Sequence, residues 1–196
     1  TYVPASELNV RIVENDQVLT LEYKDCTAEH QRSLWWGTAV GYRAMQLAAI
    51  ALSPETLWRR EDLYVVSGHP GGGVLDALNF VTGCRNNDKM KVIENPNCMN
   101  RCNSEMLFEW WVCDGKQTAH IKLRDGYVPK GFYELMDRQA YNEKVEGDDA
   151  LFELYKVNMS SRIWVEPLER NFSAQLLPPL ENGEIPTDHL WYKKTA

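Results

Sequence analysis

The fold is decided by residues 63–83, which read LYVVSGHPGGGVLDALNFVTG. The apolar residues 63–67 predict a short buried strand, and the apolar spacing of residues 74–83 predicts a helix. Between them lies the loop Gly-His-Pro-Gly-Gly-Gly at 68–73. A strand, a glycine-rich loop and a helix in this order leave backbone N–H groups pointing at an anion or a carbonyl oxygen.

The glycine-rich loop matches neither of two common nucleotide-binding motifs. No Gly-Lys-Ser/Thr follows it, and the G-x-G-x-x-G spacing of dinucleotide-binding loops is absent. Its three consecutive glycines make the backbone unusually permissive. The loop therefore predicts either an anion or carbonyl site or a flexible loop that crosses closely under the preceding helix.

A long helix is expected before this loop. Asp25 or Thr27 is a suitable N-cap, and Ser53-Pro54 stops the helix after Leu52. Gly37 and Gly41 lie on one face, although glycine costs about 1 kcal/mol in a helix relative to alanine. Two such glycines predict that another helix, a sheet or a ligand approaches closely.

The other predicted elements make the chain an α+β protein with a mainly antiparallel sheet packed against a long N-terminal helix and further C-terminal helices. They are a hairpin at 8–26, a strand at 89–93, a hairpin of 105–113 and 116–124, and helices at 131–145 and 148–159. The second hairpin turns at Asp114-Gly115, the strongest short hairpin signal in the chain. We expect one domain over residues 1–175 and an extended tail over 176–196.

The second hairpin is apolar on both faces. Phe108 and Trp110 share one face, and Leu107, Trp111 and Cys113 share the other. We expect the chain's own helices to cover one face, and a second protomer is a candidate for covering the other.

Composition and charge exclude several classes of protein. The 196 residues are 44% apolar and 25% charged, which is typical of a compact domain and not of a disordered chain. The net charge is −7 and the basic residues are dispersed, so no positive stripe is available for nucleic acid. The longest apolar stretch, residues 44–52, is too short for a membrane span. We expect a soluble cytoplasmic protein, although a cleaved secretory signal would leave no trace.

The cysteines leave the redox compartment open. They are odd in number and form no C-x-x-C pair: Cys26, Cys84, Cys98, Cys102 and Cys113. Buried reduced thiols are the simplest expectation, and the last four have irregular spacing for a structural zinc site. A Cys98–Cys102 or Cys102–Cys113 disulfide would instead indicate an oxidising compartment.

Two sequence blocks resemble the FmdE-like family, which takes its name from a component of formylmethanofuran dehydrogenase. The first includes Gly37 and Gly41-Tyr-Arg-Ala44, and the second includes Asp76-Ala-Leu-Asn79 followed by Thr82-Gly-Cys84. In that family a His-x-Cys-Pro-Gly stretch opens a helix that continues with Gly-Tyr-Arg-Ala. Asp-Ala-Ile-Gln and Thr-Gly-Cys elements follow.

The resemblance implies an α+β core, frequent homodimerisation and a cleft of His, Cys and Asp that can hold a divalent metal such as zinc. It also implies association with a larger molybdenum or tungsten oxidoreductase and with one-carbon metabolism. The chain departs from the pattern, because the motif cysteine falls on Trp35, its proline on Trp36 and a second cysteine on Gly73. These replacements remove expected zinc ligands.

Two functional hypotheses follow. In the first, the chain is an enzyme or a metal-dependent one-carbon protein, with His30 and Cys84 as metal ligands and His69 and Asp76 as catalytic residues. Histidine is the natural acid or base near neutral pH, and a carboxylate would orient it.

In the second hypothesis, the chain is a non-catalytic binding or subunit module with an aromatic pocket. An indole in place of a cysteine ligand gives an apolar surface that suits an organic molecule. The expected ligand-binding residues are Trp35, Trp36, Arg43, Gly71, Gly72 and Asn79. Elemental analysis would discriminate the hypotheses, because a stoichiometric metal favours the first.

Overall fold

The computed structural model of the chain describes residues 9–28, 35–94, 102–187 and 189. The elements among these residues are β1 (Asn9–Glu14), β2 (Gln17–Glu22), α1 (Tyr23–Ala28), α2 (Trp35–Leu52), η3 (Arg60–Asp62), β3 (Tyr64–Ser67), α3 (Gly72–Thr82), β4 (Met90–Val92), β5 (Glu109–Cys113), β6 (Thr118–Leu123), α4 (Lys130–Ala140), α5 (Asp148–Val165), α6 (Leu168–Asn171) and β7 (Phe172–Leu177).

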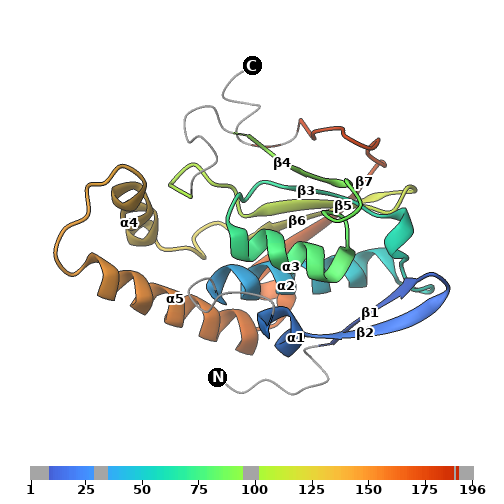
Figure 1. Ribbon diagram of the computed structural model, residues 1–196, viewed down its shortest axis with the longest axis horizontal. Helices are drawn as coiled ribbons and strands as arrows, with labels where there is room; N and C mark the ends of the chain where they lie inside the picture. The colour runs from blue at the N-terminus through green and yellow to red at the C-terminus, as the bar shows by residue number, and fades with distance from the viewer. Residues whose placement is uncertain (1–8, 29–34, 95–101, 188, 190–196) are drawn as a thin grey trace.

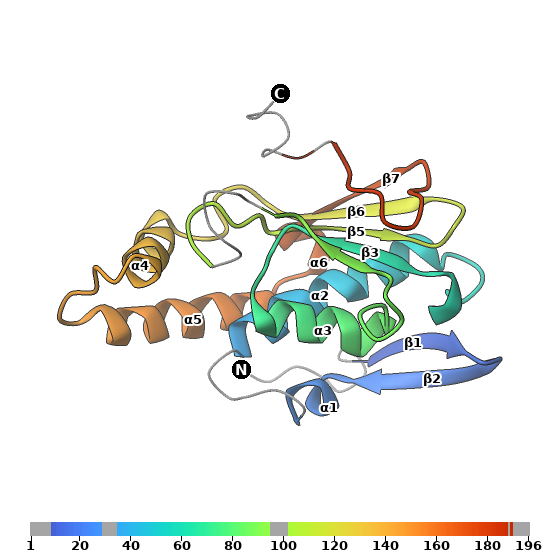
Figure 2. The same cartoon turned by 45° about the horizontal axis from the view of Figure 1, so that its top comes forward.

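The predicted α+β fold is confirmed. A five-stranded sheet has the order β4-β3-β5-β6-β7, and only its β3–β4 pair is parallel. Helices α2 and α3 lie against one face of this sheet (Figure 1). The hairpin β1–β2 and helix α1 lie beyond these helices (Figure 2). The mainly antiparallel sheet therefore rests on the predicted N-terminal helix.

Both predicted hairpins form, because each has a turn sequence that sets its register. Strands β1 and β2 pair from Asn9↔Glu22 to Glu14↔Gln17. The turn residues Asn15 and Asp16 both have positive φ, which the two-residue turns of tight hairpins require. Strands β5 and β6 pair from Glu109↔Lys122 to Cys113↔Thr118, and Gly115 in the connection 114–117 has positive φ.

The single helix predicted from Asp25 or Thr27 to Leu52 is wrong at its beginning. The structure contains α1 and α2 as separate helices, and residues 29–34 between them lie outside the described part of the chain. Tyr23 on α1 contacts Tyr42 on α2 with ring centroids 5.2 Å apart, and its hydroxyl is 3.1 Å from that of Thr38. These contacts place α1 beside α2 and not in line with it.

Helix α2 is the central helix of the core. Most of its residues are buried, and its two glycines face α3. A Cβ at Gly41 would lie 3.0 Å from the Ala77 Cβ, and a Cβ at Gly37 would lie 3.2 Å from the Gly73 Cα. The predicted close approach is therefore made by α3. No helix in the described ranges is long and apolar enough to cross a membrane.

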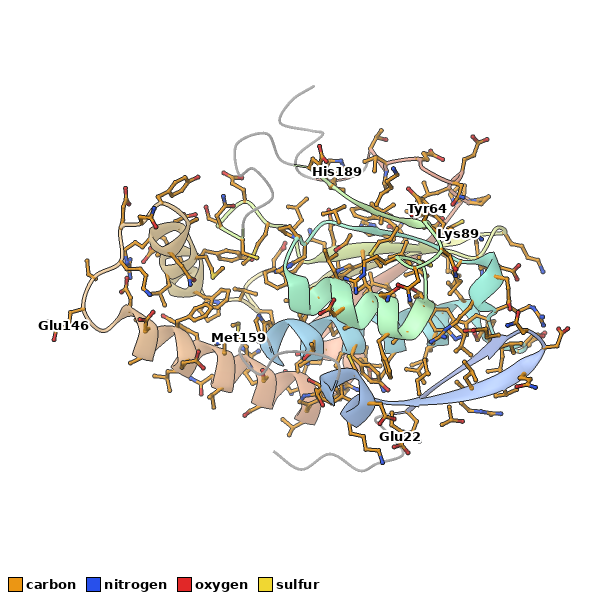
Figure 3. The ribbon with its side chains drawn as sticks, in the orientation of Figure 1. Glu22, Tyr64, Lys89, Glu146, Met159 and His189 are labelled. Atoms are coloured by element: carbon orange, nitrogen blue, oxygen red, sulfur yellow. The ribbon has the colours of Figure 1, made fainter. Side chains whose placement is uncertain are left out.

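The outer face of the sheet is covered by the chain's own C-terminal segment. Trp111 is buried there with Tyr64 and Cys113, and Leu180 packs against them. The Tyr64 hydroxyl donates to the Glu184 carbonyl oxygen at 2.7 Å. Figure 3 shows Tyr64 and His189 on the side of the sheet away from α2 and α3. A second protomer is not needed to bury Trp111.

Three predicted boundaries in the C-terminal part differ from those of the structure. The expected tail began at residue 176, but β7 continues through Leu177 as a strand at the edge of the sheet. Helix α4 ends at Ala140 instead of residue 145. Helix α5 extends past residue 159 because Ile163 still faces the core, and it ends before Pro167.

Cys102 and Cys113 are free thiols, and Cys98 lies outside the described residues.

Candidate ligand-binding cavity

A cavity of about 100 Å³ lies where the beginning of α2 meets the glycine-rich loop, α4 and α5. Its apolar lining residues are Val74, Met106, Phe132, Met136 and Phe152. Its other side chains are Trp36, His69, Cys102 and Lys156, and glycines 37 and 71–73 complete its wall. The loop predicted to face a ligand therefore does border a cavity.

His69 is fixed in the cavity wall by the loop itself. The Gly71 N–H donates to His69 Nδ1 at 2.9 Å, and the Ser67 hydroxyl donates to the His69 carbonyl oxygen at 2.8 Å. Burial lowers the pKa of His69 to about 3, so the ring is neutral at physiological pH. Because Nδ1 accepts a hydrogen bond, the proton of the neutral ring is on Nε2. His69 is therefore a hydrogen-bond donor through Nε2.

The N-terminus of α3 presents further donors. Gly71 is the N-cap and has no side chain to accept from the first turn, and this turn contains no acidic residue. The first N–H groups of an α-helix have no partner within the helix, and this end of the helix dipole is positive. Glycines 71–73 border the cavity, so a negatively charged group there would be favourably placed.

Trp36 is the polar group in the lining whose hydrogen bond is missing. It is 5% exposed, and its Nε1–H has no hydrogen-bond partner among the described residues. Its ring is parallel to that of Tyr127, with centroids 6.1 Å apart. A buried donor without an acceptor costs about 1–3 kcal/mol. An acceptor on a bound molecule would remove that cost.

Lys156 adds positive charge to the same wall. Its side chain is 5% exposed, and its ammonium group lies 2.6 Å from a carboxylate oxygen of Glu153 and 4.5 Å from the centroid of the Phe152 ring. Cys102 is a neutral thiol there, because burial raises its pKa. The cavity thus combines apolar walls with N–H donors and a cation.

The structure brings four of the predicted site residues together and separates the others. Trp36, His69, Gly71 and Gly72 line the cavity. Asp76 instead forms an ion pair with Arg85 at 2.8 Å. Trp35 begins α2, but its side chain lies outside the description, as does His30.

The three remaining predicted residues have structural partners. Asn79 Oδ1 accepts from the backbone N–H of Asn86 at 3.2 Å, and the Cys84 thiol donates to the Leu63 carbonyl oxygen at 3.4 Å. The 11 residues of α3 put about 16 Å between the glycine-rich loop and Cys84. Arg43 Nε donates to the Ile163 carbonyl oxygen at 2.9 Å, which ties α2 to the end of α5.

Several cavity residues were not predicted from the sequence. Cys102 was expected as a buried reduced thiol, or in a disulfide or a zinc site, and no role was expected for Met106, Phe132, Met136, Phe152 and Lys156. These residues come from the segment before β5 and from α4 and α5, which meet the loop only through tertiary packing. No local spacing pattern connects them to the loop.

The described residues do not fit the zinc site that the family resemblance implies. No group of three His, Cys, Asp or Glu side chains within the described ranges could hold a metal ion. His69 accepts a hydrogen bond at Nδ1 and carries its proton on Nε2, so neither nitrogen is available as a ligand. The metal stays a prediction that depends on residues outside the description.

No protein-family model matches the chain, and no curated protein matches it. The resemblance to the FmdE-like family therefore stays a prediction from its two sequence blocks.

Proposed function

We propose that the chain binds a small apolar carboxylate in this cavity. The observation that carries the proposal is the buried Trp36 Nε1–H, which has no partner among the described residues. Its side chain lines the same cavity as the uncapped beginning of α3. A carboxylate offers two oxygens that can each accept several hydrogen bonds. It would satisfy the indole and cap the helix together.

The charge of the wall favours an anion over a neutral acceptor. The dipole of α3 attracts negative charge, and so does the Lys156 ammonium group, which also pairs with the more exposed Glu153 carboxylate. The Nε2–H of the neutral His69 ring is a further donor for a carboxylate oxygen. Hydrogen bonds to charged groups contribute about 1.5–3 kcal/mol each, roughly twice as much as those between neutral groups.

The size of the cavity limits the apolar part of the ligand. Its volume of about 100 Å³ is somewhat below that of an engineered cavity that admits benzene. The walls beyond the donors are methionine and phenylalanine side chains. Short aliphatic acids of about four to six carbons fit this space best.

The ionisation of the cavity residues favours the predicted binding module over a metal-dependent enzyme. A thiol with a raised pKa is a poor nucleophile, and an imidazole with a pKa of about 3 is a poor base. Cys102 and His69 are therefore suited to holding a ligand and are not activated for chemistry.

Isothermal titration of straight-chain carboxylates from acetate to octanoate tests the proposal, with the corresponding alcohols as neutral controls. We expect the highest affinity near butyrate to hexanoate and little binding of the alcohols. Trp36→Phe keeps an aromatic ring but removes the N–H, so it should weaken binding about tenfold, or 1.4 kcal/mol.

Trp110→Phe is the matched control for this titration. Trp110 is also buried with an Nε1–H that has no partner among the described residues, but its ring packs against Phe172 in the core. Its replacement should leave carboxylate affinity unchanged. Equal affinities for alcohols and acids, or equal losses in both variants, would contradict the proposal. Stoichiometric zinc in the purified protein would favour the metal-dependent function instead.

A further inference from the structure

A groove of about 800 Å³ lies next to the cavity and is lined by residues of β5, β6 and the segments beside them. Met106 lines both spaces. Phe108 lines the groove, and its ring centroid lies 4.6 Å from that of His69 in the cavity wall. The two spaces are therefore neighbours separated by Met106 and Phe108.

The groove contains a buried carboxylate–imidazole pair. Glu109 Oε2 lies 3.1 Å from His120 Nε2, and the two side chains are 6% and 10% exposed. The Trp111 ring is nearly parallel to the His120 ring, with centroids 4.4 Å apart. Because a carboxylate accepts, His120 carries a proton on Nε2. His120 Nδ1 makes no hydrogen bond with any residue that the structure describes.

This geometry is that of an oriented general base. A carboxylate that holds one imidazole nitrogen fixes the tautomer and leaves the other nitrogen able to take a proton. His69 in the cavity differs, because its Nδ1 accepts from a backbone N–H.

Two cations border the same groove. Lys122 lies 3.7 Å from the exposed Asp125, and Arg124 donates to the backbone carbonyl oxygen of Glu169. Cations beside a general base can stabilise negative charge that develops on a substrate oxygen. An acyl group undergoing attack by water develops such a charge.

We propose that the groove is a hydrolytic site for esters of small apolar carboxylic acids. His120 Nδ1 takes a proton from water as the water oxygen adds to the acyl carbon. The tetrahedral intermediate then expels the alcohol, which receives that proton from the imidazolium. Ester and water become acid and alcohol, so no further reactant is needed.

The substrate class rests on the proposed function of the cavity. The acid released in the groove belongs to the chemical class that the neighbouring cavity would bind. Glu109 is a positioning residue in this scheme, because it acts on the substrate only through His120.

Hydrolysis of p-nitrophenyl butyrate by the full chain tests the proposal. We expect saturable hydrolysis, and His120→Ala should lower kcat at least 100-fold, the typical contribution of a general base. Free imidazole can occupy the space left by the deleted ring, so it should restore much of the rate in H120A. Glu109→Gln should lower kcat more than tenfold without changing KM, which a merely structural defect would not do.

His189→Gln is the control for a second imidazole at the groove. His189 packs edge-on against Trp111 at 6.2 Å, and its replacement should lower the rate far less than His120→Ala does. If H189Q alone abolishes hydrolysis, the assignment of His120 is overturned. The same holds if folded H120A keeps the wild-type rate or is not rescued by imidazole.

Chemical modification of the wild-type chain tests the role of His120 without any variant that could misfold. Diethyl pyrocarbonate acylates free imidazoles, and its addition at His120, located by mass spectrometry, should parallel the loss of hydrolysis. Loss of hydrolysis without modification of His120 would contradict the proposal. Carboxylate binding without esterase activity would overturn only the proposed hydrolytic site in the groove. Esterase activity without carboxylate binding would overturn only the proposed carboxylate site in the cavity.

Discussion

His69 determines how the glycine-rich loop responds to pH. The folded protein holds the ring neutral with a pKa of about 3, whereas an unfolded histidine has a pKa near 6.5. Between these values the unfolded chain binds a proton that the folded chain does not. The stability that the neutral ring provides is therefore complete above about pH 6.5 and is lost as the pH falls toward 3.

The first prediction concerns the stability that the neutral His69 ring loses as the pH falls. Between about pH 5.5 and 3.5, His69 should contribute a slope near 1.4 kcal/mol per pH unit to the free energy of unfolding. His69→Gln cannot titrate, and its amide oxygen can still accept from the Gly71 N–H. Urea denaturation at several pH values should show a flatter dependence for H69Q. Parallel curves for wild type and H69Q would show that the ring is not buried neutral.

The second prediction concerns Asp148 at the beginning of α5. Arg138 donates to both carboxylate oxygens at 2.8 Å, and this holds the pKa of Asp148 down at about 2. A lowered carboxylate pKa gives stability above the unfolded value near 3.9 that disappears as the pH falls to 2. Arg138→Gln should therefore lose less stability than wild type between pH 4.5 and 2.

The control for this prediction is Lys130→Gln. Lys130 and Glu134 are both exposed and 3.7 Å apart, so their ion pair should contribute almost nothing. Urea denaturation of K130Q should reproduce the wild-type acid dependence. A change as large as that of R138Q would mean that general charge, and not the bidentate pair, controls the acid response.

At the scale of elements, the position of the cavity depends on the contact between α2 and α3. Gly41 allows this contact, because a Cβ there would lie 3.0 Å from both the Ala77 Cβ and the Val74 carbonyl oxygen. Side chains at these two helix surfaces therefore decide how closely the glycine-rich loop approaches Trp36.

The third prediction is that Gly41→Ala destabilises the protein by up to about 2 kcal/mol. Overpacking typically costs about 1–3 kcal/mol, and the better helix propensity of alanine offsets about 1 kcal/mol of it. Thermal or urea denaturation measures the change. Adding Ala77→Gly makes room for the new methyl group, so the two substitutions should couple favourably. Simple additivity in the double mutant would contradict the close contact.

Elements with local signals could be predicted from the sequence. The turn residues Asn15-Asp16 and Asp114-Gly115 define their hairpins, and the strand–loop–helix around residues 63–83 formed as expected. Strand β7 was missed because no turn signal separates it from α6 and half of its side chains are exposed. The position of α1 beside α2 involves tertiary contacts of Tyr23 that no periodicity contains.

The candidate site could be predicted only in part for the same reason. The loop residues His69, Gly71 and Gly72 are close together in sequence, whereas Lys156 reaches them from a distant helix. The Glu109–His120 pair could have been found from the register of the second hairpin. Trp111 pairs with His120 and Glu109 pairs with Lys122, so Glu109 and His120 are diagonal neighbours on one face.

At the scale of the whole molecule, the C-terminal segment covers the cluster of buried side chains around Trp111 on the outer face of the sheet. Leu177 and Leu180 pack on the outer face of the sheet, and the Cys113 thiol donates to the Leu180 carbonyl oxygen at 3.4 Å. The face for which a second protomer was a candidate is thus buried within one chain.

The fourth prediction is that deletion of residues 178–196 exposes this face. The denaturation midpoint should fall, binding of the dye ANS should increase, and tryptophan emission should shift to longer wavelength as Trp111 meets water. Ile185→Ala is the matched control, because Ile185 is 39% exposed and should contribute little. Unchanged stability and dye binding after the deletion would mean that another surface buries Trp111.

The most direct test of the central claim is the nuclear magnetic resonance signal of the Trp36 indole N–H. Trp36→Phe identifies this signal among those of the seven tryptophans. Titration with butyrate should move its proton resonance downfield as the N–H begins to donate to the carboxylate, and butanol should not move it. An indole resonance that stays unchanged at saturating butyrate would contradict the carboxylate site.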